Sequence, residues 1–182
     1  MKYVALLRGI NISGKNKISM AELKKIFEEN GFKIMKTLLN SGNVIFDFDA
    51  VNTQFLMTNI SKIIKNKFGF DIPVFVLTAT ELKEALSNHP CWRNTPDKNI
   101  YNNLIFIIPP TTYKDIFDCI GSPSVDIDKV GNYKNYIFWS FDLKNYRKSN
   151  WGGVKTASVS LKDQITIRTA NTMYKILALC GN

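Results

Sequence analysis

Three residues near the start of the chain have the spacing of a phosphate-binding loop. Gly9, Gly14 and Lys15 follow an apolar segment at the spacing G-x-x-x-x-G-K. In a true loop of this kind, Ser or Thr follows the lysine and the helix begins there, so that backbone N–H groups meet the phosphates. Here Asn16 follows the lysine and lacks the magnesium-binding hydroxyl, and the helix signal begins only at Ser19. We therefore do not predict a nucleotide hydrolase.

The same segment contains residues that suit a different task, the binding of an anion. Together with a polar turn at residues 40 to 43, it supplies amide and cationic donors for phosphate, carboxylate or a nucleic-acid backbone. In the alternative interpretation the glycines and Asn11 only shape the loop and the lysines are merely solvated. Arg8 is the most specific candidate, because an arginine directly after an apolar strand usually has a partner. The anion-binding candidates are Arg8, Asn11, Lys15, Lys17, Asn40, Ser41 and Asn43.

A second stretch, residues 132 to 151, mixes aromatic and basic side chains. Such a mixture can stack bases and hold phosphates. However, Ile137, Trp139 and Phe141 alternate as the core face of a strand does, and the signature of an RNA-recognition domain is missing. We therefore assign Trp139 to the core. The secondary candidates are Tyr146, Arg147, Trp151 and Arg168.

Catalytic and metal-binding patterns are weak. The only histidine, His89, lies two residues from Cys91, whereas a Cys–His catalytic pair normally comes from separate elements. Asp126 and Asp128 would face the same side of a strand, but a solvated edge explains them equally well. The three cysteines form no CxxC pair. We predict no cofactor and no metal, and an enzyme is left open but not favoured.

The elements that must position these residues follow one order twice. The first half is predicted as strand, helix, strand, strand, helix, strand, which is the ferredoxin-like β-α-β-β-α-β unit. Its first helix begins at Ser19, with Glu22 completing a capping box. A linking helix over residues 80–88 then leads to a second, similar series. We predict an α+β fold of two ferredoxin-like units, an internal duplication packed together, over residues 1–78 and 79–182.

This topology explains why the anion-binding candidates should meet. The end of the first strand, the start of the first helix and the central hairpin turn share one edge of such a sheet. The positive end of the helix dipole lies at that edge too. Several strands, such as residues 3–7 and 104–108, are apolar at consecutive positions, which indicates cover on both faces.

Residues 3–46 resemble the opening of the domain of unknown function family 1697. The resemblance rests on Leu-Leu-Arg-Gly-Ile-Asn at residues 6–11, the Gly-rich basic loop after it, Met-x-x-Leu at residues 20–23 and Ser-Gly-Asn-Val at residues 41–44. It continues weakly along the chain to Thr-Ile-Arg at residues 166–168. The family usually follows that arginine with Asn-Trp, whereas this chain has Thr169 and Ala170. The resemblance implies a two-unit α+β fold of uncharacterised bacterial proteins and supplies no function.

Composition sets the remaining limits. The net charge is +9, with 24 basic and 15 acidic residues, but the excess is spread over both halves. This charge favours an anionic partner without marking a nucleic-acid-binding tail. No apolar run is long enough for a membrane span, so we expect a cytoplasmic protein with no membrane partner. The favoured function is non-catalytic binding of an anionic ligand or nucleic acid. The alternative is a small enzyme acting on a phosphorylated or carboxylated metabolite in a cleft between the units. The oligomeric state is left open.

Overall fold

The chain forms two compact units. The computed structural model describes residues 1–12, 14–40, 42–49, 52–90, 92, 97–152, 161 and 163–181. The first unit comprises Met1–Lys83 together with Lys175–Asn182, and the second comprises Glu84–Tyr174. Sequence patterns place the boundary between residues 78 and 79. In the structure it falls within helix α3 (Ala79–Ser87), which follows a strand without an intervening loop.

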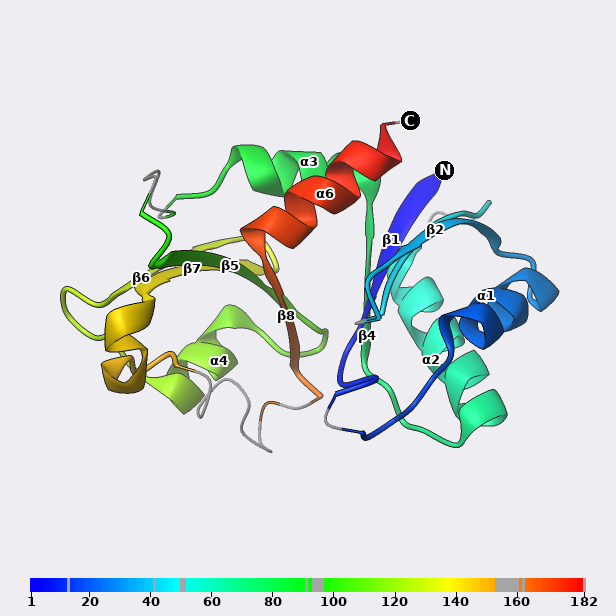
Figure 1. Ribbon diagram of the computed structural model, residues 1–182, viewed down its shortest axis with the longest axis horizontal. Helices are drawn as coiled ribbons and strands as arrows, with labels where there is room; N and C mark the ends of the chain where they lie inside the picture. The colour runs from blue at the N-terminus through cyan, green and yellow to red at the C-terminus, as the bar shows by residue number, and fades with distance from the viewer. Residues whose placement is uncertain are drawn as a thin grey trace. The chain divides into compact units, whose positions relative to one another are not determined.

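The first unit is built on a four-stranded antiparallel sheet with the strand order β2-β3-β1-β4. Two helices, α1 and α2, lie on one face of this sheet (Figure 1). The elements in chain order are β1 (Lys2–Leu7), α1 (Met20–Glu29), β2 (Lys33–Leu38), β3 (Asn43–Asp47), α2 (Thr53–Phe68) and β4 (Val74–Thr78).

Local signals explain where these helices begin and end. The Ser19 hydroxyl accepts a hydrogen bond from the Glu22 N–H (3.5 Å) ahead of α1, at the predicted capping position. Asn52 caps α2 by accepting from the Gln54 N–H (2.9 Å). Gly69 ends α2 in the left-handed conformation, with φ of 75°.

The core of the first unit is apolar and aromatic. Every residue from Tyr3 to Leu7 is fully buried, so both faces of β1 are covered, as its unbroken apolar run predicts. Phe27, Phe32 and Phe46 form a cluster with ring centroids 5.1 to 6.1 Å apart. Tyr3, at the start of β1, stacks on Phe46 of this cluster with 5.6 Å between the ring centroids, so the cluster anchors the strand from which the candidate loop leaves.

The second unit repeats the architecture of the first. Its sheet has the strand order β6-β7-β5-β8. The strands β5, β6, β7 and β8 thus take the same places as β1, β2, β3 and β4 in the first sheet. The predicted α+β fold with two similar units is therefore confirmed. The elements are β5 (Ile100–Ile107), α4 (Tyr113–Ile120), β6 (Asp128–Tyr133), β7 (Tyr136–Asp142), a 3₁₀ helix η1 (Leu143–Lys148) and β8 (Ile165–Thr169).

The core of the second unit lies between α4 and one face of this sheet. Ile116 and Ile120 of α4 pack with alternate residues of β5 and β7, including Ile105 and Trp139. The last helix, α6 (Ala170–Cys180), contributes residues to both units. None of the helices in the described ranges is long and apolar enough to cross a membrane.

Candidate anion-binding site

The loop between β1 and α1 packs tightly against the turn between β2 and β3. The Leu7 N–H donates to the Gly42 carbonyl oxygen (2.8 Å). A Cβ atom on Gly42 would lie 2.7 Å from Leu7 Cβ and 2.9 Å from Ile10 Cδ1, and φ of Gly42 is +75°. Only glycine combines this backbone conformation with so close an approach. The turn therefore lies directly against the end of β1, as the topology predicts.

Asn11 joins the loop to the turn. Its Nδ2 donates to the carbonyl oxygens of Ile18 (2.9 Å) and Asn40 (3.0 Å), and its Oδ1 accepts from the Ile18 N–H (2.9 Å). Asn16, which sequence reasoning considered only for its missing hydroxyl, donates from Nδ2 to the Gly9 carbonyl oxygen (3.0 Å). Because both Nδ2 protons of Asn11 are used, this residue holds the loop closed and is not itself a free donor.

A cavity of about 430 Å³ opens where the loop, the turn and the start of α1 meet. We call this region, with Lys15 beside it, the α1 rim. The residues that line the cavity are Asn11, Gly14, Lys17, Ile18, Ser19, Met20 and Asn40. The structure thus brings Asn11, Lys17 and Asn40 together around one opening. Figure 1 shows the loop leaving β1 and running to the amino end of α1.

The electrostatics of the α1 rim favour negative charge. Lys15 and Lys17 are exposed, and neither forms an ion pair within the part of the chain that the structure describes. Among the same residues, the backbone N–H groups of Met20 and Ala21 have no acceptor. The positive end of the helix dipole points into the same region. Glu22, in the first turn of α1, is the one acidic residue there and offsets part of this field.

The remaining predicted residues lie around the same edge in different environments. Arg8 is half-buried at the end of β1, and its backbone N–H donates to the Pro73 carbonyl oxygen (3.0 Å). Asn43 is fully buried, and its Nδ2 donates to the Leu38 carbonyl oxygen (2.9 Å) inside the hairpin. Asn43 therefore contributes to the fold of the turn and not to its surface. Ser41 lies outside the described residues.

Most aromatic side chains of the stretch over residues 132–151 are buried in the second unit. Trp151 is fully buried, and its Nε1 donates to the Gly121 carbonyl oxygen (3.0 Å). Tyr146 is half-buried, and its ring lies 5.1 Å from that of Phe141, measured between centroids. Arg147 is exposed. A buried ring cannot stack on a nucleic-acid base, so Trp151 is not available for base stacking.

Arg168 lies on β8 in a partly buried environment. Its Nη1 donates to the Thr166 hydroxyl (3.0 Å) and to the Ile167 carbonyl oxygen (2.8 Å). Burial lowers the pKa of Arg168 to about 10, so its guanidinium stays charged at neutral pH. It belongs to the second unit and is not part of the α1 rim.

The two aspartates among the weak catalytic candidates lie in different environments. Asp128 is buried at the start of β6 and accepts hydrogen bonds from Trp139 Nε1 (2.9 Å) and from the Ser149 hydroxyl (2.6 Å). Asp126 precedes the strand with φ of +63°, so the prediction that both aspartates share one strand face is wrong. Cys91 is outside the described residues. No group of three possible metal ligands occurs within the described ranges.

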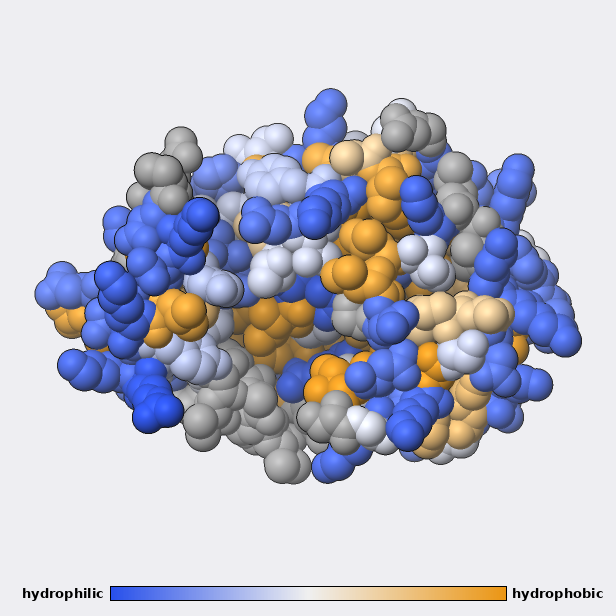
Figure 2. All heavy atoms as spheres, viewed as in Figure 1, coloured by the Kyte–Doolittle hydropathy of each residue, from blue (hydrophilic) through white to orange (hydrophobic). Residues whose placement is uncertain are grey.

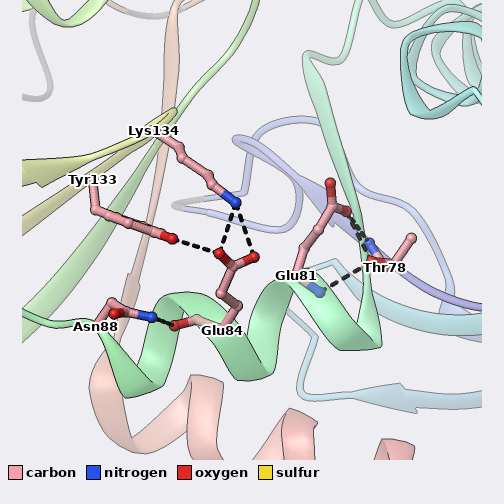
Figure 3. A network of polar contacts seen from close by, with 6 residues as sticks. All are labelled: Thr78, Glu81, Glu84, Asn88, Tyr133 and Lys134. Atoms are coloured by element: carbon pink, nitrogen blue, oxygen red, sulfur yellow. Dashed lines mark hydrogen bonds and ion pairs between the residues drawn. The ribbon is translucent and has the colours of Figure 1, made fainter.

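One polar network gave no signal in the sequence. Glu84 of α3 accepts hydrogen bonds from the Tyr133 hydroxyl and from Lys134 Nζ, the latter at 2.8 and 2.9 Å (Figure 3). The hydrogen bonds from Lys134 and then from Tyr133 lower the pKa of Glu84. Tyr133 and Lys134 follow Glu84 by 49 and 50 residues in the sequence, so no local sequence pattern predicts the contact. The network fastens α3 to the β6–β7 hairpin.

Comparisons with known proteins agree with this architecture. The model of a family described as "Protein of unknown function (DUF1697)" matches residues 1–138. No curated protein matches the chain. A solved structure, that of the conserved bacterial protein SP0830 from Streptococcus pneumoniae, is similar over 98% of each chain at 25% sequence identity and a TM-score of 0.82.

These findings give the chain a family and a fold without an activity. The family match covers most of the sequence, including the first unit up to Lys83, the strands β5 and β6, and the first three residues of β7. The similar solved structure shares the full-length architecture. The chain belongs to the DUF1697 family of proteins of unknown function.

Proposed function

We propose that the protein binds an anionic group, a phosphate in the first place, at the α1 rim. The observation that carries this proposal is the cavity of about 430 Å³ at the amino end of α1, with Lys17 in its lining and Lys15 beside it. Phosphate has three or more acceptor oxygens, which match several converging donors. We propose that this binding takes place in the cytoplasm.

The available donors set the scale of the affinity. A phosphate in the cavity would meet the N–H groups of Met20 and Ala21, which the described structure leaves without acceptors. The helix dipole adds about 1 to 2 kcal/mol in a partly buried geometry. A charge-assisted hydrogen bond from Lys17 adds about 1 to 3 kcal/mol. Together these terms amount to about 2 to 5 kcal/mol, which corresponds to binding in the millimolar range.

The composition of the α1 rim favours binding over catalysis. Among the described residues, the cavity lining includes no histidine, carboxylate or cysteine. Within the same described lining, Ser19 has the only hydroxyl, and this hydroxyl caps α1 and has no neighbouring base. A general acid or base would have to be supplied by something other than these residues.

The proposal is tested by following backbone amide chemical shifts while inorganic phosphate is added to the whole protein. We expect the amides of Lys17, Ser19, Met20 and Ala21 to shift together. Lys17→Ala should weaken binding about fivefold, which corresponds to a loss of about 1 kcal/mol. Lys62→Ala, which removes an equally exposed charge from α2 in the same unit, should bind like the wild type.

Two results would count against the proposal. Shifts spread over many lysines, with equal losses in both variants, would indicate unspecific attraction to a chain of net charge +9. The absence of shifts at the start of α1 would exclude a site there. A parallel titration with a single-stranded oligonucleotide distinguishes a nucleic-acid backbone from a small ligand, since the former binds with a steep salt dependence.

A further inference from the structure

Two exposed aliphatic side chains flank the α1 rim. Ile12 is 58% exposed in the loop, and Leu39 is 61% exposed in the β2–β3 turn. Their neighbours in the sequence, Asn11 and Asn40, are joined by the 3.0 Å hydrogen bond from Asn11 Nδ2. The two side chains therefore project from segments that are fastened to each other.

Exposure of apolar residues does not by itself mark a site. Figure 2 shows apolar residues scattered among hydrophilic ones over the face in view, as on most protein surfaces. Leu39 is distinguished by its backbone, because its φ of +59° lies in the left-handed region. Glycine and asparagine adopt this conformation easily, whereas leucine does so at a cost in free energy. The turn thus presents a water-exposed leucine where asparagine or glycine would fit better.

Cationic side chains accompany these two aliphatic residues. Lys15 follows Ile12 by three positions in the same loop, and the backbone N–H of Lys15 donates to the Ile12 carbonyl oxygen (2.9 Å). Lys15 and Lys17 have no acidic partner among the described residues. The tip of the first unit therefore combines aliphatic side chains with unneutralised positive charge.

The composition of this tip discriminates among anionic partners. Residues 8–20 and 39–43 contain no Phe, Tyr or Trp, so single-stranded nucleic acid would find no ring for base stacking. Protein interfaces are enriched in aromatic residues and arginine and depleted in lysine. Aliphatic side chains beside lysines instead suit the boundary of an anionic lipid surface, where the aliphatic groups enter and the lysines meet head groups.

We infer that the α1 rim, with Ile12 and Leu39, docks on an anionic phospholipid surface and receives a lipid phosphate in its cavity. This inference rests on the proposed function, because it identifies the source of the phosphate. The sequence predicts no membrane partner on the ground that it contains no spanning segment. Peripheral binding to a membrane requires no spanning segment, because the two aliphatic side chains insert at the lipid surface and the two lysines contact the head groups.

The test measures binding of the whole protein to vesicles by co-sedimentation. We expect binding to vesicles of phosphatidylcholine mixed with phosphatidylserine and little binding to phosphatidylcholine alone. Leu39→Asn should lower the partition coefficient about tenfold, because it removes the inserted side chain. The same change relieves the left-handed strain, so its melting temperature should equal or exceed that of the wild type. A folding defect would instead lower the melting temperature.

A matched variant controls for general loss of apolar surface. Phe55 is 56% exposed on α2 of the same unit, and Phe55→Gln should leave vesicle binding unchanged. Equal binding of Leu39→Asn and wild type, or an equal loss in Phe55→Gln, would overturn the inference.

The source of the phosphate is decided by comparing ligands. Shifts at the α1 rim with inorganic phosphate but no vesicle binding would overturn the lipid inference and leave the proposed function standing. Tight binding of a single-stranded oligonucleotide without vesicle binding would assign the α1 rim to nucleic acid and would also overturn the lipid inference. Absence of both phosphate shifts and vesicle binding would overturn both proposals.

Discussion

Replacement of Gly42 by alanine should destabilise the first unit strongly. The added Cβ would lie 2.7 Å from Leu7 Cβ, an atom fixed to the buried strand β1, and 2.9 Å from Ile10 Cδ1. Ile10 can adjust its side chain, but Leu7 Cβ moves only with the backbone. Overpacking of this kind costs about 1 to 3 kcal/mol, and the φ of +75° adds about 1 kcal/mol for a residue other than glycine. The free energy of unfolding should fall by about 2 to 4 kcal/mol.

Gly69 provides a matched control for this variant. Its φ is also +75°, but an added Cβ would meet nothing within 4 Å. Gly69→Ala should therefore cost only the backbone term of about 1 kcal/mol. The difference between the two variants isolates the close approach of the turn to Leu7 and Ile10.

The assay is urea unfolding followed by far-UV circular dichroism. Tryptophan fluorescence would miss the effect, because Trp92, Trp139 and Trp151 all belong to the second unit. A loss in Gly42→Ala no greater than in Gly69→Ala would refute the reasoning, since it would mean that the turn does not press on the end of β1. The position of the α1 rim would then need another explanation.

Two further predictions concern single charges. Glu84→Gln should lower the melting temperature at neutral pH, because its carboxylate accepts from Tyr133 and Lys134. The pKa of Glu84 is lowered in the folded protein, so its stabilising effect is fully present above pH 4.5, the usual pKa of a glutamate. It is lost as the pH falls through the pKa of Glu84 in the folded protein. The melting temperatures of Glu84→Gln and the wild type should therefore converge in acid, and a difference that persists there would contradict the assignment. Arg8→Ala should weaken phosphate binding at the α1 rim, because it removes a positive charge at the end of β1, next to the loop. A large loss of stability with unaltered binding would assign Arg8 to the architecture.

The elements of this fold were predictable because their signals are local. Ser19 caps α1, and the apolar runs of β1 and β5 mark strands that are buried on both faces. The convergence of loop and turn also followed from the predicted topology, and Asn11, Lys17 and Asn40 do line one cavity. Each of these inferences needed only neighbouring residues and the order of elements.

The misplaced residues depend on contacts that the sequence pattern around them does not reveal. Trp151 looked available beside basic residues, but it is buried and donates to Gly121, 30 positions away. Asn43 looked like a surface donor because asparagine is common in turns, yet its amide is satisfied inside the hairpin by Leu38. The periodicity of hydrophobic residues around these two positions does not indicate that they are buried. Sequence patterns can locate a polar residue in a turn, but only the fold decides which way its side chain faces.

The assignment of residues 175–182 to the first unit has a consequence for the order of folding. Lys2 Nζ donates to the Cys180 carbonyl oxygen (2.7 Å), so strand β1 is in contact with a residue 178 positions later. Figure 1 shows the end of α6 near the start of β1. During synthesis the ribosome must make all of the second unit before the first can be completed. The sheet of β1 to β4 can therefore form early in synthesis, whereas the contact between Lys2 and Cys180 can form only after the second unit has been made.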